Sequence, residues 1–150
     1  MKIYFAGPLF SEAERDWIRA IKRRIEDLAA KAERNVEVVW PYDLIGREEL
    51  AACGDRAREE IFRRCSVSLE EADAVIALLD GTQVDDGTAW EIGYFYRHTA
   101  GKAPIIGIRT DFRSAGESRK SIVNAMIECS CNIIVNSTEA LLSELERFWK

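Results

Sequence analysis

Residues 72–81, ADAVIALLDG, decide the fold of this 150-residue chain. Six consecutive apolar residues, 74–79, stand between acidic positions, and such a short run is typical of a strand that is buried on both faces. Strands of this kind belong to parallel sheets, in which crossover helices cover both faces. The stretch therefore predicts an inner strand of an α/β domain.

Further strand and helix patterns alternate on both sides of this run. Strands are expected at residues 2–6, 36–40, 74–79, 104–108 and 132–135. Helices are expected at about residues 12–34, 55–71, 88–101, 120–129 and 138–149, and the polar segment 42–55 is expected to be rich in turns. The alternation predicts a single α/β domain over residues 1–150, doubly wound in the flavodoxin-like or Rossmann-like manner. Its five-stranded parallel sheet is expected in the order 2-1-3-4-5, with helices on both faces.

Composition narrows the classes of function. The chain is 47% hydrophobic, enough for one real core, and its net charge of -5 disfavours binding to nucleic acid or to an anionic membrane. It has no apolar run long enough to span a bilayer and no signal-peptide pattern, so we expect a cytoplasmic protein whose four cysteines are reduced thiols. Cys129-x-Cys131 is not a zinc spacing and His98 is the only histidine, so no metal site is expected.

The predicted strand order places a ligand site. In open α/β sheets, ligands bind beyond the carboxyl ends of the strands, at the point where the strand order reverses. For the order 2-1-3-4-5 that point lies between the first and third strands. The segments there are residues 6–11, AGPLFS, and residues 80–91, DGTQVDDGTAWE, and the second of them is rich in acids.

Glu91 is the first candidate catalytic residue. Asp86 or Thr88 is expected to act as the N-cap of the helix that follows, which puts Glu91 in an early turn where the helix dipole favours its ionised form. A fixed, ionised carboxylate at this edge of the sheet could act as a nucleophile. Alternatively, Thr88-x-x-Glu91 has the spacing of a capping box, and for the residue alone this capping role is the favoured interpretation.

Two other polar residues accompany Glu91. Asp85 could simply form the turn, but the small residues Gly87 and Ala89 beside it would let a ligand approach closely. Tyr4 belongs to the first strand, next to the third in the expected order, so its phenol could reach a carboxylate at the strand end. A core tyrosine with a satisfied hydroxyl is the common alternative.

Four motifs together resemble the nucleoside 2-deoxyribosyltransferase family over essentially the whole chain. They are IYFAGPLF at 3–10, ADAVIALLDG at 72–81, DDGTAWEIGY at 85–94 and VNAMI at 123–127. The resemblance implies that Glu91 attacks the anomeric carbon of a deoxyribonucleoside and that Tyr4 holds Glu91. It also implies that Asp85 helps to hold the sugar 5′-hydroxyl and lies near the base, and that Asn124 and Met126 enter the pocket from a neighbouring subunit. A homo-oligomer, either a dimer or a dimer-based assembly, is then expected.

The remaining expected substrate contacts are Gly7, Phe10 and Gly87, with no metal or organic cofactor. One position departs from the family, which usually has Asp or Asn on the helix before the third strand, where this chain has Cys65. A thiol is a poor proton donor to the base. Either Asp43 serves the base instead, or base preference and rate differ, or Cys65 is a small buried apolar residue.

The expected chemistry is glycosyl transfer with retention. Cleavage of an N-glycosidic bond develops positive charge on the sugar, which a carboxylate beneath the anomeric carbon stabilises and then bonds. Asp85 is the best candidate to protonate the departing base, and the deoxyribose passes to another nucleobase or to water. The alternatives are hydrolysis of nucleoside 5′-monophosphates and, from a different class, a non-catalytic nucleotide-binding module. Asp85 and Asn124 favour a free nucleoside, because a carboxylate repels a phosphate.

Transfer to a base requires that water be excluded from the glycosyl-enzyme. Leu9, Phe10, Trp90 and Met126 could line such a dry pocket, and each is also an ordinary core or interface residue. For Trp90, core and pocket are equally expected. The sequence leaves the choice between transfer and hydrolysis open.

Overall fold

The computed structural model describes residues 1–149, and it contains one five-stranded parallel sheet in the order β2-β1-β3-β4-β5. The strands are β1 (Lys2–Ala6), β2 (Glu37–Val39), β3 (Ala74–Leu78), β4 (Ile105–Ile108) and β5 (Ile133–Val135). The helices are α1 (Glu12–Lys31), α2 (Arg47–Cys53), α3 (Ala57–Glu70), α4 (Asp86–His98), α5 (Ala125–Ser130) and α6 (Thr138–Phe148), with single 3-10 turns η1 (Pro41–Asp43) and η2 (Gly54–Arg56). The predicted fold class and strand order are confirmed.

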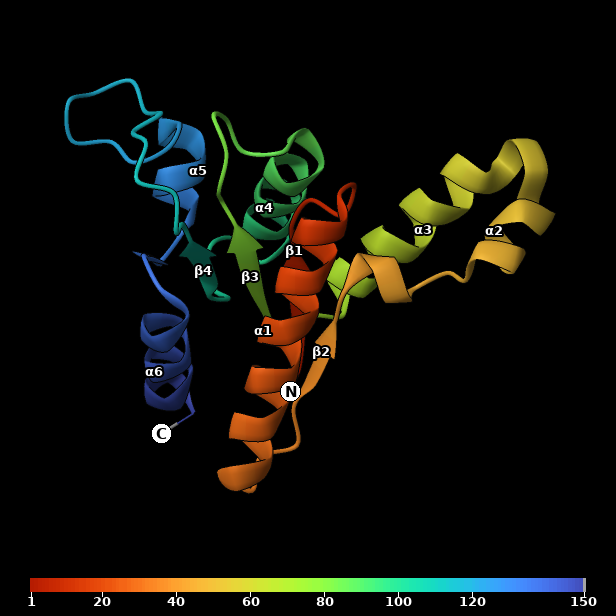
Figure 1. The fold of residues 1–150 in the computed structure, drawn as a ribbon, viewed down its shortest axis with the longest axis horizontal. Helices are drawn as coiled ribbons and strands as arrows, with labels where there is room; N and C mark the ends of the chain where they lie inside the picture. The colour runs from red at the N-terminus through yellow and green to blue at the C-terminus, as the bar shows by residue number, and fades with distance from the viewer. Residues whose placement is uncertain (150) are drawn as a thin grey trace.

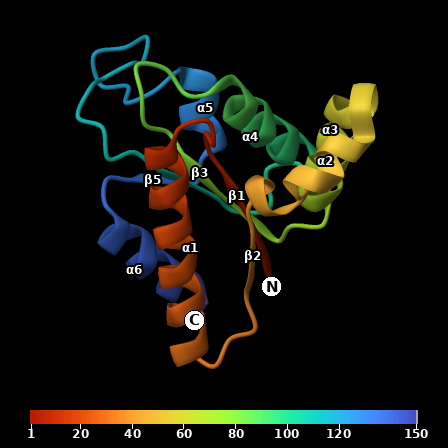
Figure 2. The same ribbon diagram turned by 45° about the vertical axis from the view of Figure 1, so that its right-hand side comes forward.

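Helices cover both faces of the sheet, because alternate side chains of each strand point to opposite faces. Ile3 and Phe5 of β1 pack into a core with α1 and α6, whereas Tyr4 and Ala6 pack into a second core with α3, α4 and α5. Figures 1 and 2 show α1 and α6 on one side of the strands and α4 and α5 on the other. Every residue of β3 is buried, as the apolar run predicted.

The segment between β2 and β3 differs from the prediction. Residues 42–55 were expected to be turn-rich, but they contain α2 (Arg47–Cys53), which follows Gly46 and consists largely of good helix formers. In Figure 1, α2 and α3 project together from the β2 edge of the sheet. No helix within residues 1–149 is both long enough and apolar enough to cross a membrane.

The helix expected from residue 120 begins later. Asn124 is the N-cap of α5, because its side chain accepts a hydrogen bond from the backbone N–H of Met126. The preceding loop is folded back on itself: the N–H of Ala115 donates to the carbonyl of Ile122, and the N–H of Ile122 donates to Glu128. These contacts hold residues 115–122 outside the helix.

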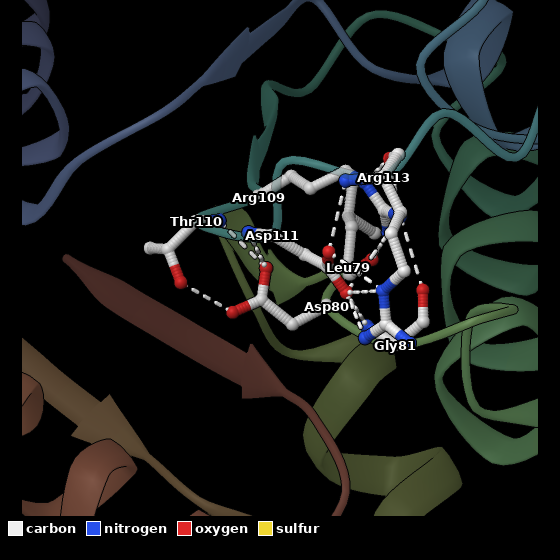
Figure 3. A network of polar contacts seen from close by, with 7 residues as sticks. All are labelled: Leu79, Asp80, Gly81, Arg109, Thr110, Asp111 and Arg113. Carbon is white, nitrogen blue, oxygen red and sulfur yellow. Dashed lines mark hydrogen bonds and ion pairs between the residues drawn. The ribbon is translucent and has the colours of Figure 1, made fainter.

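A buried arginine ties the ends of β3 and β4 together (Figure 3). Arg109 is 3% exposed and donates to the carbonyl oxygens of Leu79, Gly81 (3.0 Å) and Arg113 (2.8 Å). Asp80 accepts from the N–H groups of Thr110 (2.6 Å) and of the next residue. The network fixes the segment that leads from β3 into α4, and therefore the position at which α4 begins.

Candidate active site

A cavity of about 480 Å³ opens at the carboxyl ends of β1 and β3, where the strand order reverses. Six of the ten predicted site residues line it: Gly7, Phe10, Cys65, Asp85, Gly87 and Glu91. They come from the β1–α1 loop, from α3 and from the N-terminal end of α4. The structure therefore brings together segments that are far apart in the sequence, at the edge where a ligand was expected.

Glu91 is held by a tyrosine that lies behind it. The hydroxyl of Tyr4 donates to Oε1 of Glu91 at 2.6 Å, across 87 positions of the sequence. Tyr4 is fully buried in β1, where it pairs with Val75 of β3. Within residues 1–149, no hydrogen bond reaches the second oxygen, Oε2, so this oxygen remains available to a ligand in the cavity.

The electrostatics of Glu91 differ from the expectation. Burial raises its pKa to about 7, the negative charge of Asp85 adds to the increase, and the Tyr4 hydrogen bond opposes it. The helix position was expected to favour the ionised form of Glu91, but the loss of water around the carboxyl outweighs the Tyr4 hydrogen bond and shifts the pKa upward. Burial and the neighbouring carboxylate also raise the pKa of Tyr4 far above its ordinary value, so Tyr4 remains a donor.

Asp85, not Asp86 or Thr88, is the N-cap of α4. Its Oδ2 accepts from the backbone N–H of Thr88 at 2.9 Å and from the Thr88 hydroxyl at 3.0 Å. A Cβ on Gly87 would stand 3.2 Å from the same oxygen, so a small residue suits this position. The capping-box interpretation of Glu91 is wrong, because the cap is complete without it and Glu91 is bound by Tyr4 instead.

The two candidates for contact with the base lie in different environments. Cys65 of α3 is half-buried and lines the cavity, and burial raises the pKa of its thiol, which is therefore neutral. Asp43 is exposed on η1, forms an ion pair with Lys22 at 2.9 Å, and is not among the cavity residues. The structure does not support Asp43 as the acid that protonates the base, since its carboxylate pairs with Lys22 of α1.

Asn124 and Met126 lie on the surface beside α4 and do not line the cavity of their own chain. The side-chain oxygen of Asn124 caps α5, and its amide donates to Glu117. Met126 is 78% exposed. Their expected contribution to the pocket of a neighbouring subunit stays a prediction.

The wall formed by η1 and α2 was missed by sequence reasoning. Tyr42, Ile45, Arg47 and Leu50 of this segment line the cavity together with Ile61 of α3. The available signal was the local helix propensity of residues 47–53, which the polar composition of the segment obscured.

Trp90 is neither in the core nor in the cavity. It is 44% exposed and stacks on Tyr94 with ring centroids 4.9 Å apart, and the ring of Phe62 from α3 lies tilted against it with centroids 5.5 Å apart. The expectation that Trp90 serves the core or the pocket is therefore wrong. Its position on α4, one residue before Glu91, turns it to the outer side of the helix.

The fold and the site define a doubly wound α/β protein with a buried carboxyl in a cavity at the strand switch point, where proteins of this architecture bind small ligands. Residues 3–126 match the family model described as nucleoside 2-deoxyribosyltransferase, and the chain belongs to this family. Membership supports deoxyribosyl transfer or N-glycosidic cleavage in general.

Solved structures share the fold of this chain. The chain is 27% identical to a conserved protein from Enterococcus faecalis V583, with a TM-score of 0.77 and 98% of each chain covered. It is 22% identical to a 2-deoxyribosyltransferase from Bacillus psychrosaccharolyticus (TM-score 0.73, covering 95% of this chain and 90% of the other). It is 16% identical to a CMP N-glycosidase from Clostridium botulinum (TM-score 0.59, covering 97% and 99%). The last two similarities concern the fold alone.

Proposed function

We propose that the protein cleaves the N-glycosidic bond of 2′-deoxyribonucleosides and transfers the deoxyribose to another nucleobase or to water. The observation that carries this proposal is the Glu91 carboxyl, which lines the cavity at the strand switch point and is oriented by the 2.6 Å hydrogen bond from Tyr4. Family membership supplies the class of chemistry.

In the proposed mechanism, ionised Glu91 attacks C1′ of the sugar. The C1′–O bond forms as the C1′–N bond breaks, and the base departs with the bonding electron pair and takes up a proton. An incoming base nitrogen, or water, then attacks C1′ from the opposite face, and the Glu91 carboxylate is released. The two displacements give overall retention of configuration.

Tyr4 and Asp85 have different duties in this proposal. Tyr4 is a donor at all ordinary pH values, so it fixes the orientation of Glu91 without taking its proton. Asp85 engages Thr88 through Oδ2, which leaves Oδ1 for the sugar 5′-hydroxyl or for the proton that the base requires. One carboxyl is therefore the nucleophile and the other binds and exchanges protons.

The acidic end of the cavity favours a free nucleoside over its 5′-monophosphate. Asp85 and Glu91 both line this end. A phosphate held close to a carboxylate in a partly dry site would be repelled by roughly a few kcal/mol. Steady-state rates with deoxyadenosine and with its monophosphate test this preference, and faster turnover of the monophosphate would reverse it.

The proposal includes a homo-oligomer in which Asn124 and Met126 complete the pocket of a neighbouring subunit. Met126 is an exposed apolar side chain, which suits burial against a second copy. Sedimentation under assay conditions tests this part, and a monomer with full activity would contradict it.

The function is tested by incubating the protein with deoxyinosine and adenine. We expect deoxyadenosine and free hypoxanthine as products of transfer, or hypoxanthine and deoxyribose as products of hydrolysis. Glu91→Gln is the matched control, because glutamine keeps the shape and can still accept from Tyr4 but cannot act as the nucleophile. Turnover that survives undiminished in this variant would refute the assigned role.

A further inference from the structure

The part of the cavity wall that comes from the η1–α2 segment and α3 is largely apolar and contains one cation. Tyr42, Ile45 and Leu50 of the η1–α2 segment, with Ile61 of α3, supply the apolar side chains. Arg47, the first residue of α2, is the only Lys or Arg among the residues that line this cavity within residues 1–149.

Within residues 1–149, Arg47 has no ion pair, whereas Arg64 and Lys22 pair with carboxylates of the η1–α2 segment. Arg64 is bound by Glu49 and Glu60, and Lys22 lies 2.9 Å from Asp43. Within the part of the chain that the structure describes, Arg47 has no ion pair and no side-chain hydrogen bond. A guanidinium carries five N–H donors and is always charged, so Arg47 presents unused donors at the cavity wall.

We propose that Arg47 recognises the nucleobase and selects purines with a 6-oxo group, such as hypoxanthine and guanine. The inference rests on the proposed function, because the base is placed by the sugar that Glu91 attacks. With C1′ at Glu91 and the 5′-hydroxyl near Asp85, the base extends away from α4 toward the η1–α2 wall. The apolar side chains then cover the faces of the ring, and Arg47 meets its edge.

The chemistry of the edge gives the selectivity. O6 and N7 of a 6-oxopurine are two adjacent acceptors, which match two parallel guanidinium donors. Adenine carries an amino donor in place of O6 and cannot accept from Arg47 at that position. Cys65, which also lines the cavity, is a neutral thiol and cannot offer two parallel donors.

A phosphate is a less suitable partner for Arg47. A 5′-phosphate is attached at the sugar end of the substrate, beside Asp85, whereas Arg47 comes from the opposite wall. If Arg47 bound a phosphate nevertheless, its removal would affect 5′-monophosphates and leave free nucleosides unchanged. That result would overturn the proposal.

The test compares kcat/KM for deoxyinosine, deoxyadenosine and deoxyinosine 5′-monophosphate in the wild type, Arg47→Met and Arg47→Lys. We expect Arg47→Met to lower the value for deoxyinosine by about 10- to 100-fold and to leave deoxyadenosine unchanged. Lysine should restore only part of the loss, because its point charge lacks the two parallel donors. Arg58→Met, an exposed arginine of α3 outside the cavity, is the matched control and should change neither rate.

The outcomes separate the inference from the proposed function. If the wild type turns over both nucleosides and Arg47→Met lowers kcat/KM equally for both, Arg47 does not discriminate between the bases. The inference is then overturned, and the proposed function is unaffected. If the wild type turns over neither, the proposed function fails. Calorimetric titration with hypoxanthine and with adenine then decides about Arg47: weaker binding of hypoxanthine alone in Arg47→Met supports the inference, and any other pattern overturns it.

Discussion

Replacement of Glu91 by glutamine should stabilise the protein, and by an amount that depends on pH. The pKa of Glu91 is about 7 in the folded chain, against an ordinary value of 4.5 that applies when the chain is unfolded. Because the folded pKa is raised, the protonated group is favoured by folding, and this contribution is lost as the pH rises toward and through about 7. At about 1.4 kcal/mol for each pH unit, ionised Glu91 costs the folded state about 3 kcal/mol.

The assay is urea unfolding of the wild type and of Glu91→Gln over a series of pH values. The difference in free energy of unfolding should grow from about 0.4 kcal/mol near pH 4.5 to about 3 kcal/mol near pH 8.5, in favour of the variant. Titrating groups that do not interact with Glu91 contribute equally to both proteins, so they cancel in the difference. Equal slopes of the two denaturation curves will show that the unfolded states are comparable.

Two results would refute this reasoning. A difference that does not vary with pH would mean that Glu91 has the same pKa in the folded and unfolded chain. A wild type that gains stability over the variant as the pH rises would mean that the folded pKa is lowered, as the helix dipole alone would suggest. In either case, burial would not be the factor that determines the pKa of the Glu91 carboxyl.

Three further predictions follow from the same contacts. First, kcat/KM should rise with pH with a midpoint near 7, because only ionised Glu91 is a nucleophile. Tyr4→Phe should move that midpoint to higher pH, because it removes the hydrogen bond that lowers the pKa of Glu91. A midpoint near 4.5, or a shift to lower pH in the variant, would contradict this prediction. Second, Asp85→Ala should cost about 1 kcal/mol of stability, whereas Asp85→Asn keeps the cap and should lose activity with little loss of stability. Equal unfolding midpoints for the two variants would refute the capping role. Third, Arg109→Met should lower the free energy of unfolding in urea by about 2–3 kcal/mol, because it leaves the carbonyls at the end of β3 without their buried donor. An unchanged midpoint would show that the network is dispensable.

The sequence was sufficient for the parts of the structure that local patterns control. The apolar run at 74–79 identified the inner strand, and strand–helix alternation was enough to predict the sheet order and hence the edge where the cavity lies. Glu91 and Asp85 were expected at that edge because they follow the third strand directly. No long-range information was required for these steps.

The properties that depend on contacts between distant segments were not predictable in the same way. The pKa of Glu91 depends on the loss of water around a carboxyl that contacts Tyr4, 87 positions away, so a local argument from the helix position did not give the direction of its shift. Asp43 was expected near the base, but its pairing with Lys22 is set by the packing of η1 against α1. The Arg47 wall was not predictable because it depends on how α2 is placed beside the segments after β1 and β3.

The most direct test of the account is mass spectrometry of the protein quenched during turnover of a deoxynucleoside. The account predicts that a fraction of the protein gains the mass of one deoxyribosyl group, that the adduct maps to the peptide containing Glu91, and that Glu91→Gln shows none. An adduct on a different residue, or continuing turnover in the Glu91→Gln variant, would contradict the claim that this carboxyl forms the covalent bond to the sugar.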